Sequence, residues 1–302
     1  MLKELKRNKQ LYLMCIPALL LLLFLAYVPM VGIWMAFTDY NLKDGIFGSE
    51  FVGLRWFKYF FTNPTGMGLK VVKNTLVINF WGLILGTTIP ITIAICFNEI
   101  RGKLFKKLTQ SAMFFPYFLS WVVVGAIIWA FFSTSNGAVN GMLEDLGMKT
   151  VRWYAEKKYW KPIVITASIW KWCGYNSIIY MAAMSNFDKS LYEAASVDGA
   201  NKFQQIWHIT LPLLIPTVVV LSLMSIGRIF FGDFGMIYGI VGNNSLLYDE
   251  VAVIDTYVYS AMKSLGFSYT TAIGLFQSVM GLILVTGSNK LAKKITGGEG
   301  LF

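Results

Sequence analysis

Long apolar blocks are the feature of this sequence that most constrains its fold. A helix that crosses the hydrocarbon core of a bilayer needs about 20 mainly apolar residues, because each residue advances it by about 1.5 Å. Six stretches reach that length, at about 12–37, 76–97, 113–132, 162–184, 213–231 and 270–291. We therefore predict an all-α polytopic membrane protein with six transmembrane helices, forming a single domain over residues 1–302.

The composition excludes the main soluble classes of protein. Of the 302 residues, 56% are hydrophobic and 14% are charged, whereas soluble domains are about 45–50% apolar and about 25% charged. The three cysteines lie inside apolar runs, which argues against a disulfide scaffold. One histidine, His208, cannot build a histidine metal site, and we expect no metal.

The net charge of +10 is distributed as expected for a membrane protein. Basic residues flank the apolar runs instead of gathering on one face, so we expect no nucleic-acid partner. The tight cluster Lys3, Lys6, Arg7 and Lys9, and the short basic loop from Arg101 to Lys107, indicate cytoplasmic segments. Both termini are therefore predicted to lie in the cytoplasm.

The segment between the fourth and fifth spans predicts two short helices, at about 190–209. Ser190 followed by Glu193 fits a capping box at the start of the first helix, and Gly199 is placed to end it. Asn201 followed by Gln204 fits the start of the second helix. From these residues alone, the segment is either a lever that transmits motion to the spans or an amphipathic hairpin that only connects them.

The same segment carries a resemblance to a known family. Glu193-Ala194-Ala195, Asp198-Gly199-Ala200 and Ile209-x-Leu211-Pro212 resemble the EAA loop of ABC importer permeases. Further stretches resemble the carbohydrate (maltose-type, complex-oligosaccharide) branch of these permeases: Phe115–Trp121, Ile169–Trp172, Asp255–Tyr259 and Ala272–Val279. Together these matches cover most of the chain.

The resemblance implies a type I ABC importer permease fold and a role in oligosaccharide import across a bacterial cell membrane. It implies four kinds of partner besides membrane lipid: a second homologous permease, two ATPase subunits, an external solute-binding lipoprotein and the oligosaccharide. It also implies that the first helix of the loop docks on an ATPase. The contact residues it implies are Leu191, Tyr192, Glu193, Ala194, Ala195, Asp198, Gly199, Ala200 and Phe203.

The sequence contains no Gly-x-x-x-x-Gly-Lys-Ser/Thr loop, the motif that cradles nucleotide phosphates. We therefore expect the chain to bind no cofactor and to be no enzyme, with ATP and magnesium on the partner ATPase. The alternative function is an ion-coupled secondary transporter of a small polar solute. That class predicts carboxylates or broken helices at mid-membrane, and the acidic residues here avoid the span centres.

A polar stripe in the fourth span is the best candidate for solute contact. Trp172, Asn176 and Tyr180 are spaced four apart, which places them along one face of a helix. Such a stripe suits a cavity that takes a sugar, but hydrogen bonding between helices explains it equally well. The remaining candidates for the substrate path are Asn79, Ser120, Trp121, Lys171, Asp233 and Tyr257.

Lys171 lies near the middle of the fourth span, where an ionisable group is costly. Asp233 and Asp255 are possible partners for an ion pair, and an interfacial position is another explanation. If Lys171 and Arg228 both faced the cavity, they could neutralise an acidic sugar.

Overall fold

The computed structural model describes residues 8–100, 102–242 and 244–296. Four of the basic residues used to predict orientation, Lys3, Lys6, Arg7 and Arg101, lie outside these ranges. The chain forms two compact units, one of residues 1–64 and 258–276 and the other of residues 65–257 and 277–302.

The first unit begins with one long helical stretch. It consists of α2 (Lys9–Leu22), the π-helical η1 (Leu23–Tyr27) and the 3-10 helix η2 (Val28–Phe37). The most apolar part of this stretch buries none of its residues within the chain. A helix that is apolar all round and uncovered needs a lipid or protein environment to shield it.

The rest of the first unit is built around aromatic side chains. Strands β1 (Thr38–Asp39) and β2 (Glu50–Phe51) pair antiparallel around α3 (Gly45–Gly48), and α4 (Arg55–Thr62) follows. The buried Phe60 and the neighbouring Trp56 and Tyr59 of α4 make edge contacts with Tyr269. Tyr269 belongs to α15 (Ile254–Thr296), which is kinked at Gly266, where φ is +79°.

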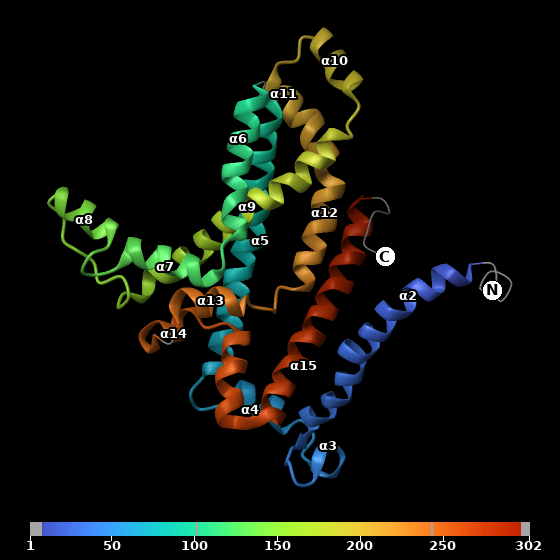
Figure 1. Cartoon of the computed structure of the whole chain (residues 1–302), viewed down its shortest axis with the longest axis vertical. Coiled ribbons are helices and arrows are strands. Elements are labelled where there is room, and N and C mark those ends of the chain that lie inside the picture. The colour runs from blue at the N-terminus through green and yellow to red at the C-terminus, as the bar shows by residue number, and fades with distance from the viewer. Residues whose placement is uncertain (1–7, 101, 243, 297–302) are drawn as a thin grey trace. The chain divides into compact units, whose positions relative to one another are not determined.

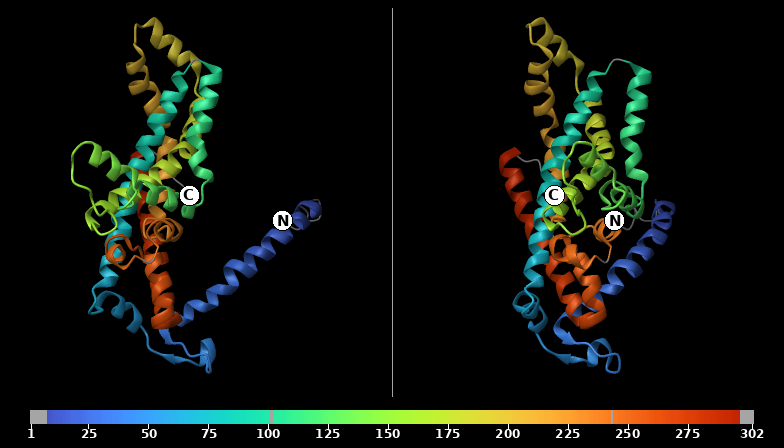
Figure 2. Two further views of the ribbon diagram at one scale, coloured as in Figure 1. Left: turned by 60° about the vertical axis from the view of Figure 1, so that its left-hand side comes forward. Right: turned by 90° about the vertical axis from the view of Figure 1, so that its left-hand side faces the viewer.

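The second unit contains the long helices that position the candidate site (Figure 1). In chain order its helices begin with α5 (Met67–Glu99), α6 (Lys103–Phe114), η3 (Phe115–Phe118), α7 (Trp121–Phe132), α8 (Ala138–Asp145), η4 (Lys157–Tyr159) and α9 (Trp160–Ser185). They continue with α10 (Lys189–Val197), α11 (Lys202–Gln205), the π-helical η5 (Ile206–Thr210), α12 (Leu211–Gly227), α13 (Phe234–Val241), α14 (Ser245–Val251) and both ends of α15. Figure 2 shows that α10 and α11 lie at one end of the long helices.

The core of the second unit lies where α5, α7, α9 and α13 meet, around the fully buried Trp160. Two glycines allow the backbones to approach closely. A methyl group at Gly125 would lie 2.0 Å from the carbonyl oxygen of Gly239, and one at Gly174 would lie 2.0 Å from that of Met113. These contacts fix α7 against α13 and α9 against α6, because any larger side chain would force the helices apart.

The prediction of one continuous helix over 113–132 is wrong. The rod formed by α6 and η3 (Lys103–Phe118) and the helix α7 differ in direction by 103°. The chain is extended at Leu119 and Ser120, where ψ is 135° and 155°. Pro116 lacks an N–H group and restricts its neighbours, so it favours a break in this region.

Four helical stretches among the described residues are long and apolar enough to cross a membrane: Lys9–Phe37, Met67–Glu99, Lys202–Gly227 and Ile254–Lys294. The bent pair described above would be a fifth. The predicted fourth span corresponds to α9. This helix is long enough to cross a membrane, but its mean hydropathy is too low for it to count among these stretches. Lys161, Lys171 and Asn176 are the most hydrophilic residues of this helix.

Candidate functional site

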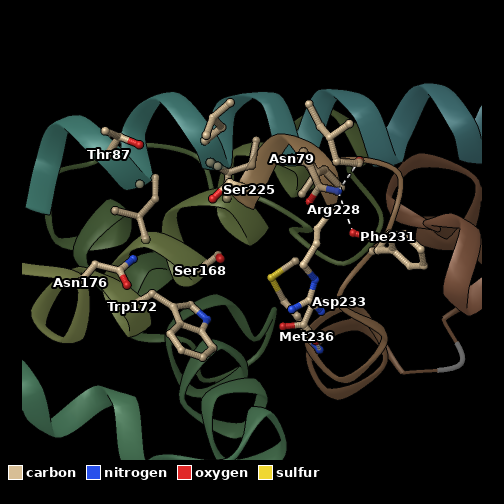
Figure 3. A pocket seen from close by; sticks show the side chains of 18 of the residues that line it. Asn79, Thr87, Ser168, Trp172, Asn176, Ser225, Arg228, Phe231, Asp233 and Met236 are labelled. Atoms are coloured by element: carbon tan, nitrogen blue, oxygen red, sulfur yellow. Dashed lines mark hydrogen bonds between the residues drawn. The ribbon is translucent and has the colours of Figure 1, made fainter. Parts of the chain in front are cut away.

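A cavity of about 680 Å³ lies within the second unit, between α5, α9, the end of α12 and the start of α13 (Figure 3). Its walls combine hydrogen-bonding groups with apolar and aromatic surfaces, as expected of a site for a small polar molecule. The polar lining residues are Asn79, Thr87, Ser168, Asn176, Ser225, Arg228 and Asp233. The larger apolar ones include Trp172, Phe231, Phe234 and Met236.

The turn that joins α12 to α13 forms one wall of this cavity, and α5 holds it in place. The Asn79 Nδ2 donates to the carbonyl oxygens of Ile229 at 2.7 Å and Phe231 at 2.9 Å. These two carbonyls lie just beyond the end of α12, where no further helical turn supplies N–H donors. The Asn79 amide satisfies them instead. Asn79 therefore fixes the turn as well as lining the cavity.

The other side of the same turn is held by α15. Asp255 Oδ2 accepts from the backbone N–H of Gly232 at 2.5 Å and from Gln277 Nε2 at 3.2 Å. Gln277 Nε2 also donates to the carbonyl oxygen of Phe230 at 3.0 Å. The turn is thus anchored by side chains from two different helices.

Two charged side chains from this turn face the cavity. Arg228 follows the last residue of α12 and is exposed, and its guanidinium makes no hydrogen bond or ion pair with any residue that the structure describes. Asp233 accepts from the Trp121 Nε1 at 2.9 Å and from the backbone N–H of Met236 at 2.9 Å, which caps α13. The carboxylate is therefore held by neutral donors, while the guanidinium is paired with no residue of the described ranges.

Lys171 is not part of the cavity wall. Its side chain is 6% exposed, and its Nζ donates to the carbonyl oxygens of Pro116 at 3.3 Å, Tyr117 at 2.8 Å and Leu119. These carbonyls belong to η3 and to Leu119 at the break that follows it; the Pro116 carbonyl also accepts from the Leu119 N–H at 3.2 Å. Of the two explanations left open for Lys171, the ion pair is not present, since neither Asp233 nor Asp255 forms one with it among the described residues.

Aromatic rings surround this break next to the cavity. The rings of Tyr117 and Tyr175 stack with centroids 4.5 Å apart, and Tyr117 meets Trp172 edge to face at 5.4 Å. Trp172 is shared between this aromatic group and the cavity lining. Its ring is therefore held at a fixed orientation beside the cavity.

Of the nine residues predicted for the substrate path, four line the cavity: Asn79, Trp172, Asn176 and Asp233. Ser120 instead caps α7 by accepting from the Val123 N–H, and Trp121 supports Asp233. Tyr180 is buried in a separate apolar cluster with Leu214, and Tyr257 is buried outside the cavity lining.

Sequence reasoning did not select several lining residues. Thr87, Ser168, Ser225 and Met236 were missed, and Arg228 was considered only together with Lys171. A signal existed for Ser168, which lies four residues before Trp172 and so extends the Trp172–Asn176 stripe toward the N-terminus of α9. No local pattern distinguishes Arg228, because its position depends on the fold of the turn.

The helix α10 is the second candidate site. Its N-cap is Asp188, whose Oδ1 accepts from the backbone N–H of Ser190 at 2.9 Å. Hydrogen bonds from the backbone and side chain of Ser190 lower the pKa of the Asp188 carboxyl. The prediction that Ser190 and Glu193 form the capping box is therefore wrong by two residues.

The end of α10 agrees with the prediction. Gly199 adopts a left-handed conformation with φ of +84°. The Gly199 N–H donates to the Ser196 carbonyl at 3.2 Å, and the Ala200 N–H donates to the Ala195 carbonyl at 2.9 Å. These two bonds form a Schellman motif, which satisfies carbonyls at the end of a helix.

The predicted capping box of Asn201 and Gln204 is confirmed, with both reciprocal hydrogen bonds present. The helix that starts there is not a separate short element, however, because α11, η5 and α12 form one stretch from Lys202 to Gly227. The wider π turn of η5 precedes Pro212, whose ring would clash with a carbonyl four residues earlier in a regular helix.

Side-chain contacts tie α10 to this long helix. The Gln205 Nε2 donates to the Ser196 Oγ at 2.9 Å and to the Ala200 carbonyl at 3.2 Å. The hydroxyls of Tyr192 and Thr210 are 3.0 Å apart. Hydrogen bonds therefore join α10 directly to the helical stretch that continues into α12.

The residues predicted to contact a partner are largely accessible on α10 and the following turn. Leu191, Glu193, Ala194, Asp198, Gly199 and Phe203 are exposed, while Tyr192, Ala195 and Ala200 are partly buried. Val197, which sequence reasoning did not select, is 88% exposed. A small cavity of about 360 Å³ lies beside them, lined by Ala195, Asp198, Gly199, Ala200, Gln204, Gln205, His208 and Ile209.

Comparison with known proteins identifies the family. Residues 86–296 match the family described as binding-protein-dependent transport system inner membrane component. The chain is 40% identical to the polygalacturonan/rhamnogalacturonan transport system permease YteP of Bacillus subtilis and 38% identical to its protein LplB, over 99% of this chain and 92% of each relative.

The structure is similar to a chain in the crystal structure of a bacterial alginate ABC transporter in complex with an alginate pentasaccharide-bound periplasmic protein. The TM-score is 0.87 at 33% identity, with 98% of each chain covered. YteP and the alginate transporter are named for sugar transport, and the family is described as a transport component of the inner membrane, which favours ATP-driven transport over the ion-coupled alternative. The chain belongs to the family of binding-protein-dependent transport system inner membrane components, the permeases of ABC transporters.

Proposed function

We propose that the chain forms the path for an oligosaccharide through a bacterial ABC importer and receives the force of ATP hydrolysis through α10. The observation that carries this proposal is the rigid attachment of α10 to the helix that ends at the cavity wall. Gln205 and Tyr192 link α10 to the stretch Lys202–Gly227, and Arg228 of the cavity follows directly. A push on α10 would therefore reach the cavity along one helix.

The proposed docking surface is the exposed side of α10 and the turn after it. Leu191, Val197 and Phe203 present apolar side chains there, with Glu193 and Asp198 among them. Ala194 and Ala195 are small, so a partner surface could approach the helix closely. Coupling then requires that the ATPase and the solute-binding protein favour the same conformation of the permease.

The proposed substrate path includes the cavity residues Asn79, Trp172, Asn176 and Asp233. A pyranose ring has apolar faces and a rim of hydroxyl groups, so it suits a wall that offers the Trp172 ring beside amide and hydroxyl side chains. Ser120, Trp121 and Lys171 would act indirectly, by shaping the break beside the cavity. We assign no substrate contact to Tyr180 and Tyr257.

We further propose that one domain over residues 1–302 crosses the membrane six times, with both termini in the cytoplasm. The crossings would be Lys9–Phe37, α5, the bent pair Lys103–Phe132, α9, the stretch Lys202–Gly227 and the later part of α15. The cationic start of α6, with Lys103, Lys106 and Lys107, supports a cytoplasmic location for that end.

The proposed assembly contains this permease, a second homologous permease, two ATPase subunits and an external solute-binding lipoprotein, surrounded by membrane lipid. ATP and magnesium would bind to the ATPase subunits, with no cofactor on this chain and no role for nucleic acid. The solved alginate transporter complex, which contains a periplasmic protein, supports such an arrangement.

The test is co-purification of the permease with its ATPase together with sugar uptake by the reconstituted importer. We expect Glu193→Arg to abolish both, because it places a cation at the centre of the docking helix. Glu144→Arg is the matched control, since it makes the same change on another exposed helix, α8. Unchanged uptake by the Glu193 variant would refute the docking role of α10.

A further inference from the structure

We infer that Arg228 recognises a carboxylate group on the transported sugar, so that the cargo is a saccharide built from uronic acids. The inference rests on the proposed function and specifies its substrate class. It starts from a cation in the cavity wall that forms no ion pair with any other described residue. Such a group within a membrane protein is costly and usually faces a functional partner.

Arg228 is placed on a rigid support. Its own carbonyl accepts from the Phe231 N–H at 2.9 Å, and its N–H donates to the Ser225 carbonyl at 3.0 Å. Asn79, Asp255 and Gln277 anchor the same turn from α5 and α15. A side chain that starts from a fixed backbone loses less conformational freedom on binding, which favours a recognition role.

The direction of the side chain agrees with this role. Figure 3 shows Arg228 extending toward Asp233 and Met236, with Trp172 and Asn176 on the opposite side of the pocket. Asp233 already uses one oxygen for Trp121 and the other for the Met236 N–H. The guanidinium donors therefore remain available to a ligand.

A carboxylate fits these donors better than a hydroxyl group does. The guanidinium offers parallel N–H groups in a planar fork that matches the two oxygens of a carboxylate. A sugar ring stacked on Trp172 could direct its hydroxyl groups toward Asn176 and Ser168 while its acid group meets Arg228. A neutral sugar would offer the guanidinium no carboxylate to bind.

The comparisons support the same substrate class independently. One relative is named for transport of polygalacturonan and rhamnogalacturonan, and one structural neighbour for transport of alginate. Polygalacturonan and alginate are polymers of uronic acids, and galacturonic acid is a repeating component of rhamnogalacturonan.

The experiment uses the complete importer in proteoliposomes and compares uptake of a galacturonate oligosaccharide with uptake of its methyl ester. Esterification removes the charge and keeps the sugar skeleton. An alginate pentasaccharide and a neutral arabino-oligosaccharide complete the panel. The same solute-binding protein serves every permease variant, so differences between variants report on the permease.

We expect Arg228→Gln to lower uptake of the acidic sugars by about 10- to 100-fold, the range for a lost hydrogen bond to a charged group. Uptake of the methyl ester should change less than threefold. Arg228→Lys keeps the charge at the end of α12 but loses the fork, so its uptake should fall between the two. Arg152→Gln, an exposed arginine outside the cavity lining, is the matched control and should leave uptake unchanged.

The outcomes separate this inference from the proposed function. If the importer takes up the neutral sugar and Arg228→Gln has no effect, the carboxylate inference is refuted and oligosaccharide import stands. An equal loss for acid and ester would also refute it. If no oligosaccharide in the panel is imported or stimulates ATP hydrolysis, the proposed function fails as well. Co-purification of each variant with the ATPase verifies that it has folded.

Discussion

The loop around α10 and the turn around Arg228 are both short connections held rigid by hydrogen bonds, but their partners come from very different distances along the chain. In the α10 loop, the side-chain hydrogen bonds join residues between 2 and 18 positions apart, and only the exposed ion pair of Lys202 with Glu99, among the described residues, reaches farther. In the turn, Asn79 bonds residues 150 and 152 positions away, and Gln277 bonds one 47 positions away. The first region is therefore a local structure and the second a product of tertiary packing.

This difference predicts where mutations should act. The α10 loop should be altered only by changes within it, whereas the cavity wall should be sensitive to residues on distant helices. The break between η3 and α7 resembles the cavity wall, because Lys171 bonds carbonyls more than 50 positions away.

The largest effect is expected from Lys171→Met. The substitution keeps the side-chain volume but removes the Lys171 donor from three carbonyls, of which Pro116 retains the Leu119 N–H, and it should destabilise the fold by about 3 kcal/mol. Thermal unfolding in detergent is the measurement. Lys70→Met, at a half-exposed ion pair with Asp249, is the control and should change stability by less than about 1 kcal/mol. Equal stability of both variants would contradict the role of Lys171 as a cap for the break.

Asn79→Leu should have the next largest effect. It removes the donor to the Ile229 and Phe231 carbonyls and should loosen the cavity wall at a cost of about 1–3 kcal/mol. Sugar uptake should fall while co-purification with the ATPase stays normal. Loss of ATPase association instead would mean that the cavity wall and the docking helix are not separate regions.

Gly199→Val should weaken association with the ATPase and leave the cavity wall intact. Its cost in stability should be smaller than that of Asn79→Leu. Its φ of +84° disfavours a branched side chain by about 1–2 kcal/mol, and no atom lies within 4 Å of an added Cβ. The strain should distort the end of α10 and weaken ATPase association. Gly147→Val, with φ of +69° and equally open space, supplies the same strain elsewhere and should leave association intact.

The smallest effect concerns Asp188 and pH. Because its folded-state pKa is below the ordinary 3.8, the contribution of this cap is present above that value and is lost as pH falls through the lowered pKa. Hydrogen–deuterium exchange of α10, corrected for intrinsic rates, should be constant from pH 7 to 5 and increase below pH 4. Asp188→Asn keeps an acceptor that does not titrate, so its exchange should lack this pH dependence.

Local chemistry explains which features could be predicted from the sequence. The end of α10 at Gly199 and the capping box of Asn201 and Gln204 follow from residues at most five positions apart. Asp188 was missed because two short polar residues, Asp188 and Ser190, both fit an N-cap. Either residue could serve as the N-cap and accept from a free N–H group of the first helical turn. Only the backbone conformation selects one of them.

The sequence by itself determined that apolar helices cross a membrane and that a short helix ending at Gly199 is followed by a capping box at Asn201 and Gln204, because both depend on spacing within a few turns. Only the tertiary structure decided that Lys171 caps a broken helix and that Arg228 faces a cavity. Both lysine and arginine are costly in an apolar span, and the sequence shows that cost equally for each. Which of them is satisfied by protein carbonyls and which is left for a ligand depends on groups brought together from more than 50 residues away.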